Sequence, residues 1–326
     1  MDVAHDSRPF VEKYRPSTLE EMIGNEEISG TLNRLIDSNQ LPHLLFYGPP
    51  GTGKTTTVLA CARRMYGANF RSMVLELNAS DDRGIDVVRE QIKSFASTKT
   101  IFNSGSKLII LDECDAMTKD AQFALRRVIE KFVMNARFCL ICNFVNRIIP
   151  ALQSRCTKFR FGPLPAELMS GKLDEVVANE EISVTPGARQ ALLVLAGGDM
   201  RKTLNVLQSA SMAHDEVDEA AVYATTGDPE PAVIDSIFHS LLNDEFAECN
   251  GKIKGMRVAR GFALVDIVSA VHLKLLELDA PDAALQQLFE KLADVEYRLS
   301  FGTSELLQTS AVVGAFSTMR DAVVAK

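Results

Sequence analysis

Short apolar runs alternate with longer amphipathic stretches in the first half of the chain. Four of these runs, each bounded by polar or turn residues, lie at 43–48, 72–78, 107–113 and 137–143. Runs of this length suit strands that are buried on both faces of a parallel sheet. Between two of them, at 120–132, apolar residues recur at spacings of three and four, as on the buried face of a helix. This alternation predicts an α/β domain with a mainly parallel sheet.

The strand signal disappears in the second half. Gly162, Pro163 and Pro165 break the pattern, and a second Gly/Pro-rich break lies at 225–231. Glycine and proline favour loops over helix interiors, and the stretches after each break have helical periodicity. The chain is therefore predicted to contain three domains, which are an α/β domain over 1–162, a small helical domain over 163–227 and a C-terminal helical domain over 228–326.

The last of these domains carries a long apolar stripe at helical spacing. Its members are Leu285, Leu288, Phe289, Leu292, Val295 and Leu299. A stripe of this kind is compatible with contacts between subunits, but it is more often the core of its own domain. The pattern alone leaves both interpretations open.

Composition places the chain among ordinary globular proteins. Its 326 residues are too many for one simple core, and its 46% hydrophobic and 24% charged residues are typical values. No apolar run approaches the roughly 20 residues that span a bilayer, and residues 1–10 lack the features of a secretory signal. We therefore expect no membrane segment and an intracellular protein, nuclear or cytosolic.

Six cysteines are scattered through apolar surroundings. Cys139 and Cys142 form a CxxC inside a predicted strand, where positions i and i+3 point to opposite faces and suit a shared metal ion poorly. Neither a second CxxC nor a spaced pair of histidines accompanies them. We expect buried, reduced thiols with a structural role.

Charge is distributed unevenly along the chain. The first 162 residues carry 22 Lys and Arg against 18 Asp and Glu, whereas the remainder carries 13 against 25. Nucleic-acid contact, if the protein makes any, is therefore expected in the N-terminal half. The small excess there is also compatible with chance.

A glycine-rich loop follows the first predicted strand and precedes a predicted helix. It fits the pattern GxxxxGK[ST], and with the next residue it consists of Gly48, Pro49, Pro50, Gly51, Thr52, Gly53, Lys54, Thr55 and Thr56. Such a loop turns backbone N–H groups and a helix N-terminus toward phosphates. Lys54 is expected to reach the β- and γ-phosphates, and Thr55 to place its hydroxyl on Mg²⁺. The alternative is a chance glycine-rich turn.

Polar residues end two other predicted strands. Asp112 closes a strand that we expect beside the phosphate loop, where it would hold Mg²⁺ through a water. Glu113 is the candidate general base that polarises the attacking water, although an acidic turn is the simpler alternative. Asn143 ends the following strand and is expected to contact the γ-phosphate or that water, unless it only caps the next loop.

With these motifs in this order, the chain resembles the AAA+ ATPases, and further stretches narrow the resemblance. FVEKYRP (10–16), LNASDDRGIDVVR (77–89), DECDAM (112–117), SRC (154–156) and GGDMRKTLNVLQ (197–208) together look like the small subunits of replication factor C, the eukaryotic sliding-clamp loader. Two further stretches, FASTKTIF and EYRLSFG, narrow the resemblance to one type among these small subunits. The resemblance spans the chain and implies an AAA+ fold. This fold comprises a RecA-like parallel sheet with flanking helices, a small helical lid and a C-terminal all-α collar that joins subunits.

The resemblance also implies residues around the nucleotide. Val11, Arg15 and Ile23 would line the base pocket; without the resemblance, a mobile N-terminal arm would be the preferred interpretation. Arg201 looks like the arginine by which the lid senses the γ-phosphate, for which a permanently charged guanidinium with several donors is suited. Arg155 looks like an arginine finger directed in trans at the ATP of a neighbouring subunit. A surface arginine and a structural salt bridge are the respective alternatives.

Contact with DNA is a further implication. Clamp loaders of this family hold primer–template DNA mostly through its phosphates, which gives affinity without sequence specificity. Arg83, Arg89 and Lys93 are the candidates, with Arg89 and Lys93 one helical turn apart. The alternative is a solvated basic face that Asp86 and Glu90 dilute.

The function implied is that of an ATPase subunit, with ATP and Mg²⁺, in a nuclear hetero-pentamer that opens the sliding clamp and loads it onto primer–template DNA in replication and repair. In the family the same small subunits also serve in loaders with a different large subunit. Two alternatives remain open. One is a subunit that holds ATP as a scaffold without turnover, and the other is another AAA+ motor, such as a branch-migration helicase or a protein unfoldase.

Overall fold

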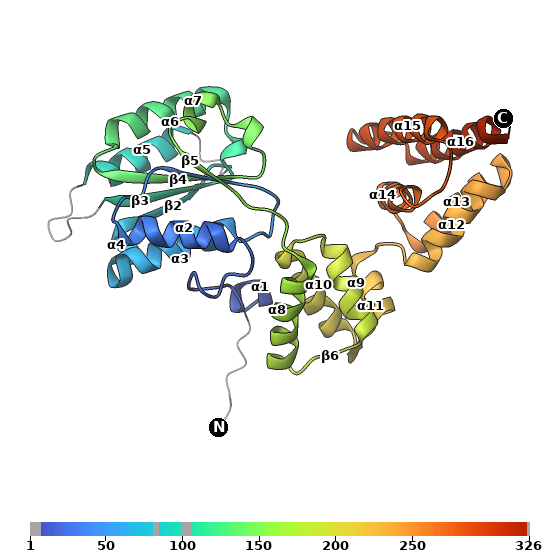
Figure 1. Ribbon diagram of the computed structural model, residues 1–326, viewed down its shortest axis with the longest axis horizontal. Helices are drawn as coiled ribbons and strands as arrows, with labels where there is room; N and C mark the ends of the chain where they lie inside the picture. The colour runs from blue at the N-terminus through green and yellow to red at the C-terminus, as the bar shows by residue number, and fades with distance from the viewer. Residues whose placement is uncertain (1–7, 81–84, 99–105, 325–326) are drawn as a thin grey trace. The chain divides into compact units, whose positions relative to one another are not determined.

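The computed structural model describes residues 8–80, 85–98 and 106–324 (Figure 1). Contacts divide the chain into two compact units, Met1–Val217 and Asp218–Lys326. The domain boundaries at 162 and 227 stay predictions. None of the helices within the described ranges is both long and apolar enough to cross a membrane.

The first unit is built on a five-stranded parallel sheet in the order β2-β3-β4-β1-β5. Its strands are β1 (Leu44–Tyr47), β2 (Val74–Asn78), β3 (Lys107–Asp112), β4 (Ala136–Cys142) and β5 (Thr157–Arg160). The first three predicted apolar runs contain β1, β2 and β3, and the fourth covers all of β4 except its first residue, Ala136. Strand β5 was not predicted, because it is an edge strand of mostly exposed residues with a single apolar side chain, Phe159.

The strand that ends at Asp112 was expected beside the phosphate loop, and Thr55 of that loop does donate to Asp112, at 2.7 Å. Within the sheet, β1 pairs with β4 and β5, and β3 lies one strand further from β1. The end of β4, which carries Asn143, therefore lies between the end of β1 and the end of β3. Order along the chain does not determine order within a sheet when every connection is a crossover.

Helices cover both faces of this sheet, as Figure 1 shows. One face carries α2 (Glu26–Asp37), α3 (Lys54–Tyr66), η1 (Gly67–Asn69) and α4 (Phe70–Met73), and the other carries α5 (Ile85–Ser97), η2 (Cys114–Ala116), α6 (Lys119–Phe132), η3 (Val145–Arg147) and α7 (Pro150–Gln153). Helix α6 begins where the Thr118 hydroxyl accepts a hydrogen bond from the amide of Ala121. Its predicted apolar face is buried against the sheet. Packing on both faces explains why β1, β3 and β4 read as continuous apolar runs.

The remainder of the first unit is mainly helical. It consists of α1 (Phe10–Lys13) and of a part that we call the lid, made of α8 (Ala166–Asn179), β6 (Ser183–Val184), α9 (Pro186–Ala196), α10 (Met200–Ala213) and β7 (Glu216–Val217). Asp199 caps α10 by accepting a hydrogen bond from the amide of Lys202 at 3.0 Å. Such a cap satisfies one of the unpaired N–H groups at a helix start. It fixes where α10 begins, one residue before Arg201.

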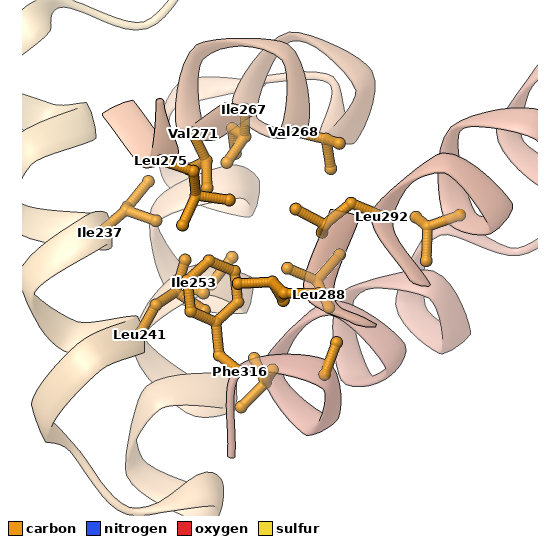
Figure 2. Close-up of a cluster of buried hydrophobic side chains, with 14 of the residues drawn as sticks. Ile237, Leu241, Ile253, Ile267, Val268, Val271, Leu275, Leu288, Leu292 and Phe316 are labelled. Atoms are coloured by element: carbon orange, nitrogen blue, oxygen red, sulfur yellow. The ribbon is translucent and has the colours of Figure 1, made fainter. Parts of the chain in front are cut away.

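The second unit begins with α11 (Glu219–Thr226) and continues with helices around one apolar core (Figure 2). The helices that form this core are α12 (Pro231–Asn243), α13 (Phe246–Arg260), α14 (Leu264–Leu275), α15 (Asp282–Ser300) and α16 (Glu305–Val324). Leu288, Leu292 and Val295 of the apolar stripe are buried in this core, and Phe289 and Leu299 pack against it. The stripe is therefore the core of its own domain, which resolves the two interpretations that the sequence left open.

Candidate nucleotide site

The phosphate loop has a backbone that requires glycine. Gly48, Gly51 and Gly53 have φ values of 141°, 66° and 90°, a region that side chains with a Cβ rarely adopt. A Cβ on Gly48 would lie 2.0 Å from the carbonyl oxygen of Phe161, and one on Gly51 would lie 1.6 Å from a carboxylate oxygen of Asp199. The loop therefore packs closely against Phe161, which follows β5, on one side and against Asp199, which precedes α10, on the other.

Lys54 is the first residue of α3 and is only 8% exposed. Its ammonium donates to the carbonyl oxygens of Gly48 and Pro49, both at 2.7 Å, and to Oδ1 of Asn143 at 3.0 Å. Burial lowers the pKa of this ammonium, and the nearby Asp112 carboxylate partly opposes that shift. A cation with so little water gains much from a phosphate anion, so these residues fit a nucleotide's phosphates.

Thr55 and Asp112 meet at the start of α3. The Thr55 hydroxyl donates to Oδ2 of Asp112 at 2.7 Å, while Oδ1 of Asp112 accepts from the amide of Glu113 at 2.8 Å. A hydroxyl and a carboxylate are oxygen ligands of the type that Mg²⁺ prefers. The pair therefore fits the ion that the sequence predicted for them.

Glu113 lies beside this pair with an exposed side chain and a left-handed backbone, at φ 54°. Positive φ is uncommon for a residue with a Cβ and concentrates at functional sites. Its side chain lines the same cavity as Lys54 and Thr55. Glu113 thus lines the space where a nucleotide would lie.

Asp115 organises the neighbouring strand end, a contact that sequence reasoning missed. Its Oδ2 accepts hydrogen bonds from the consecutive amides of Asn143 and Phe144, both at 3.1 Å. This carboxylate therefore fixes the backbone that presents Asn143 to Lys54. Asp115 belongs to the DECDAM stretch (112–117) already singled out. The sequence therefore pointed to this segment, but it did not show which groups the Asp115 carboxylate contacts.

One cavity brings together nearly all of the residues predicted around the nucleotide. The predicted residues on its wall are Val11, Arg15, Ile23, Pro50, Gly51, Thr52, Gly53, Lys54, Thr55, Thr56, Asp112, Glu113, Asn143 and Arg201. Gly48 and Pro49 contribute the carbonyl oxygens that accept from Lys54. The cavity thus has a charged end at the phosphate loop and residues from α1 and the lid elsewhere on its wall.

Several lining residues were not predicted. They are Glu12, Tyr14, Pro16, Glu21, Met22, Leu164, Lys172, Met200 and Leu204. Ile23, Leu164 and Met200 share a small apolar cluster with the lid, so part of the wall is apolar and suits a nucleobase. Met200 and Leu204 are one turn apart on α10 and flank Arg201, a spacing that could have indicated a wall of the cavity.

Arg155 and Lys93, which were predicted to contact other partners, do not line this cavity. Arg155 forms an ion pair with Glu130 and donates to the carbonyl oxygen of Ala151 at 2.8 Å. Of the three candidates for DNA contact, Arg83 and the side chain of Arg89 fall outside the described residues, and Lys93 is exposed on α5.

The cysteines match the structural role expected of them. Five of the six are buried and Cys156 is half-buried, all as free thiols. Burial raises the pKa of the Cys142 thiol to about 12, which keeps it protonated and unreactive. Over the described part of the chain, no group of three or more His, Cys, Asp or Glu side chains could hold a metal ion.

Comparisons with known proteins agree with this geometry. Residues 44–164 match the ATPase family associated with various cellular activities (AAA), and residues 229–315 match the replication factor C C-terminal domain. The chain is 54% identical to replication factor C subunit 5 of Mus musculus, with 98% of this chain and 94% of the relative covered. It is 48% identical to replication factor C subunit 3 of Saccharomyces cerevisiae, with 95% and 93% covered.

Among solved structures, the RuvB Holliday junction branch migration motor of Thermotoga maritima is similar, with a TM-score of 0.52. The match covers 74% of this chain and 85% of that one at 15% sequence identity, so it shows a shared fold alone. The predicted AAA+ fold, with its parallel sheet and C-terminal helical domain, is thereby confirmed. Together with the near full-length identity above, it establishes that this chain belongs to the replication factor C small subunits, a family of AAA+ ATPases.

Proposed function

We propose that this chain hydrolyses ATP as a subunit of a sliding-clamp loader, which opens the clamp and loads it onto primer–template DNA in the nucleus. Membership of the replication factor C family carries with it an AAA ATPase domain and partnership with other replication factor C subunits. The observation that supports turnover is the connected set of Lys54, Asn143, Thr55, Asp112 and Glu113 around one cavity. A subunit that only holds ATP has no need of this complete set.

In this proposal the loop and Lys54 bind the β- and γ-phosphates. Lys54 is already ordered by three oxygen acceptors, so little side-chain entropy is lost when phosphate oxygens replace one or more of them. Mg²⁺, when bound by Thr55 and Asp112, neutralises charge on the phosphates. The amide end of Asn143 is left to face the γ-phosphate or the attacking water.

Glu113 is proposed as the general base. The attacking water gives a proton to its carboxylate while the water oxygen bonds to the γ-phosphorus and the bond to the ADP oxygen breaks. The exposed position of Glu113 on the cavity wall supports this role. Arg201 approaches the same cavity from the lid, where its fixed positive charge would stabilise the γ-phosphate and report its presence.

Arg155 is proposed to act on a neighbouring subunit's ATP. It lies outside this chain's own cavity, and its contacts with Glu130 and Ala151 hold it on α6 and α7. An arginine finger supplied in trans makes hydrolysis depend on assembly. The loader is thus proposed to turn over ATP only when its subunits are aligned on clamp and DNA.

The second unit is proposed as the collar that joins subunits. Near the end of α15 and the start of α16 lie exposed apolar side chains, namely Tyr297 (66% exposed), Phe301 (71%), Leu306 (57%) and Leu307 (71%). Exposed aromatic and leucine side chains in a group are typical of protein contact surfaces. DNA contact through Arg83, Arg89 and Lys93 stays a prediction.

The test is Glu113→Gln in the reconstituted loader. ATP turnover at this site, stimulated by clamp and DNA, is expected to fall by roughly a hundredfold or more, as for loss of a general base, while ATP still binds. The matched control is Glu26→Gln, which changes an exposed glutamate at the start of α2. Each variant is measured in a loader whose other subunits carry a substituted phosphate-loop lysine, so that only this site reports. Unchanged turnover in Glu113→Gln would show that Glu113 is not the general base, whereas no turnover by the unaltered chain under these conditions would leave it a nucleotide-holding scaffold.

A further inference from the structure

Helix α1 is fastened to the lid by polar contacts at both of its ends. At its start, the amide of Phe10 donates to Oε1 of Gln208, on α10, at 3.1 Å. At its end, Lys13 and Tyr14 both reach Glu180, the residue that follows α8. A helix of four residues is not stable alone, so these contacts determine where α1 lies.

Glu180 is the centre of this attachment. Its Oε1 accepts from the hydroxyl of Tyr14 at 2.5 Å and pairs with the ammonium of Lys13 at 2.6 Å. The Glu180 side chain is only 9% exposed. A carboxylate with so little water keeps its charge only where donors compensate it, so its contacts are stronger than those of a surface ion pair.

The Tyr14 ring is placed to act as a donor. Burial, followed by the Glu180 carboxylate, raises the pKa of Tyr14 to about 12, so the hydroxyl keeps its proton. Two ammonium groups flank the ring, with Lys13 Nζ 5.7 Å and Lys172 Nζ 6.0 Å from its centroid. Cations within about 6 Å of an aromatic ring are attracted to it. The tyrosine is thus held by its hydroxyl and by its ring.

The same short segment forms part of the cavity wall. Val11 lies between Phe10 and Lys13, Arg15 follows Tyr14, and both line the cavity. Lys172 of α8 lines it as well. The contacts to Glu180 therefore fix residues on the wall while Glu180 itself does not line it.

We propose that Glu180 is a positioning residue for nucleotide binding, which holds the base-side wall of the cavity through Tyr14 and Lys13. The proposal rests on this cavity being the nucleotide site, but not on hydrolysis. It means that α1 and the lid form one binding surface. A nucleotide that contacts Val11 and Arg15 then favours the lid position in which Glu180 is attached.

The test measures binding of ADP and of inorganic pyrophosphate to the full chain, the latter by competition. In Glu180→Ala, the Kd for ADP is expected to rise about tenfold, which corresponds to about 1.4 kcal/mol. The Kd for pyrophosphate, which has no base, is expected to change less than about twofold, because the phosphate loop is untouched. Tyr14→Phe removes only the hydroxyl contact, and Glu180→Gln removes only the charge facing Lys13, so both are expected to weaken ADP binding less.

The matched control is Asp174→Ala on the lid helix α8. Asp174 pairs with Arg189 at 2.7 Å, away from the cavity wall, and its loss is expected to leave both dissociation constants unchanged. The proposal is overturned if ADP binding is unchanged in Glu180→Ala and Tyr14→Phe, or if ADP and pyrophosphate weaken by the same factor. Thermal unfolding shows whether Glu180→Ala folds. If it does not, Tyr14→Phe and Glu180→Gln test the proposal in the same way, by whether ADP binding weakens more than pyrophosphate binding. Because neither ligand is hydrolysed, the result is independent of whether Glu113→Gln abolishes turnover.

Discussion

The phosphate end of the cavity is formed by consecutive loop residues and two strand ends, whereas the opposite wall is formed by α1, the segment that follows it, and the lid. At the phosphate end, Lys54 donates hydrogen bonds both to the loop carbonyl of Gly48 and to Asn143, and Thr55 donates one to Asp112. On the other wall the contacts run from Tyr14 to Glu180, across 166 positions of the sequence. One end is thus a local, highly connected polar network, and the other is assembled from distant segments with an apolar cluster between them.

This difference predicts two classes of variant. A change at the phosphate end alters contacts shared by every ligand that carries phosphates, so ADP and pyrophosphate are expected to weaken together. A change on the opposite wall is expected to weaken ADP alone. The ratio of the two effects therefore measures how separate the two ends are.

The largest effect is expected from Gly48→Ala. The new methyl group would lie 2.0 Å from the carbonyl oxygen of Phe161, at a φ of 141° that alanine avoids. Holding alanine in this conformation costs on the order of 1–3 kcal/mol, so ADP and pyrophosphate binding are both expected to weaken by up to about a hundredfold. Competition binding with both ligands checks it.

The control for this variant is Gly30→Ala in α2. Beyond its chain neighbours and the backbone of its own helix, no atom lies within 4 Å of the added methyl group there, and alanine in a helix interior stabilises by roughly 0.5–1 kcal/mol relative to glycine. Both dissociation constants should stay as in the unaltered chain. Normal pyrophosphate binding by Gly48→Ala would contradict the loop geometry.

An intermediate effect is expected from Asp115→Ala. The change leaves the amides of Asn143 and Phe144 without their acceptor and releases the backbone that presents Asn143 to Lys54. Loss of two charge-assisted hydrogen bonds is expected to lower kcat by roughly tenfold, with a smaller change in the KM for ATP. Steady-state turnover in the reconstituted loader checks it.

Asp120→Ala, in the exposed first turn of α6, serves as the control for Asp115. It removes a carboxylate of the same kind from a nearby position that does not touch the strand ends. A fall in kcat of the same size in both variants would show that Asp115 acts through general charge rather than through Asn143.

The phosphate end was readable from the sequence because its chemistry is local. The spacing of glycines, Lys54 and Thr55 determines the loop, and the apolar runs that lead to Asp112 and Asn143 determine the strand ends. Which strand neighbours which was not readable, and the pattern indicated no order of β3 and β4 relative to β1. The edge strand β5 was missed because its residues 157–160 are mostly exposed and polar.

The opposite wall was less readable because its contacts are distant in sequence. The resemblance supplied Val11, Arg15 and Ile23, but nothing in the local pattern around Glu180 indicates that it meets Tyr14. The same limit applies to Asp199, whose carboxylate lies against Gly51. A pattern reports how a segment buries its own face, whereas contacts between segments depend on the packing of the whole unit.

The smallest effect is expected from Val11→Ala, which truncates the wall held by Glu180 without touching its anchor. Val11 is half-buried and lines the cavity. Two methyl groups are lost, worth up to about 1.6 kcal/mol if fully buried and about half of that here, so the Kd for ADP is expected to rise about fourfold. Pyrophosphate binding is expected to be unchanged. Val194→Ala, on the lid and 64% exposed, should alter neither constant. Equal weakening of both ligands by Val11→Ala would mean that the two ends of the cavity act as one unit.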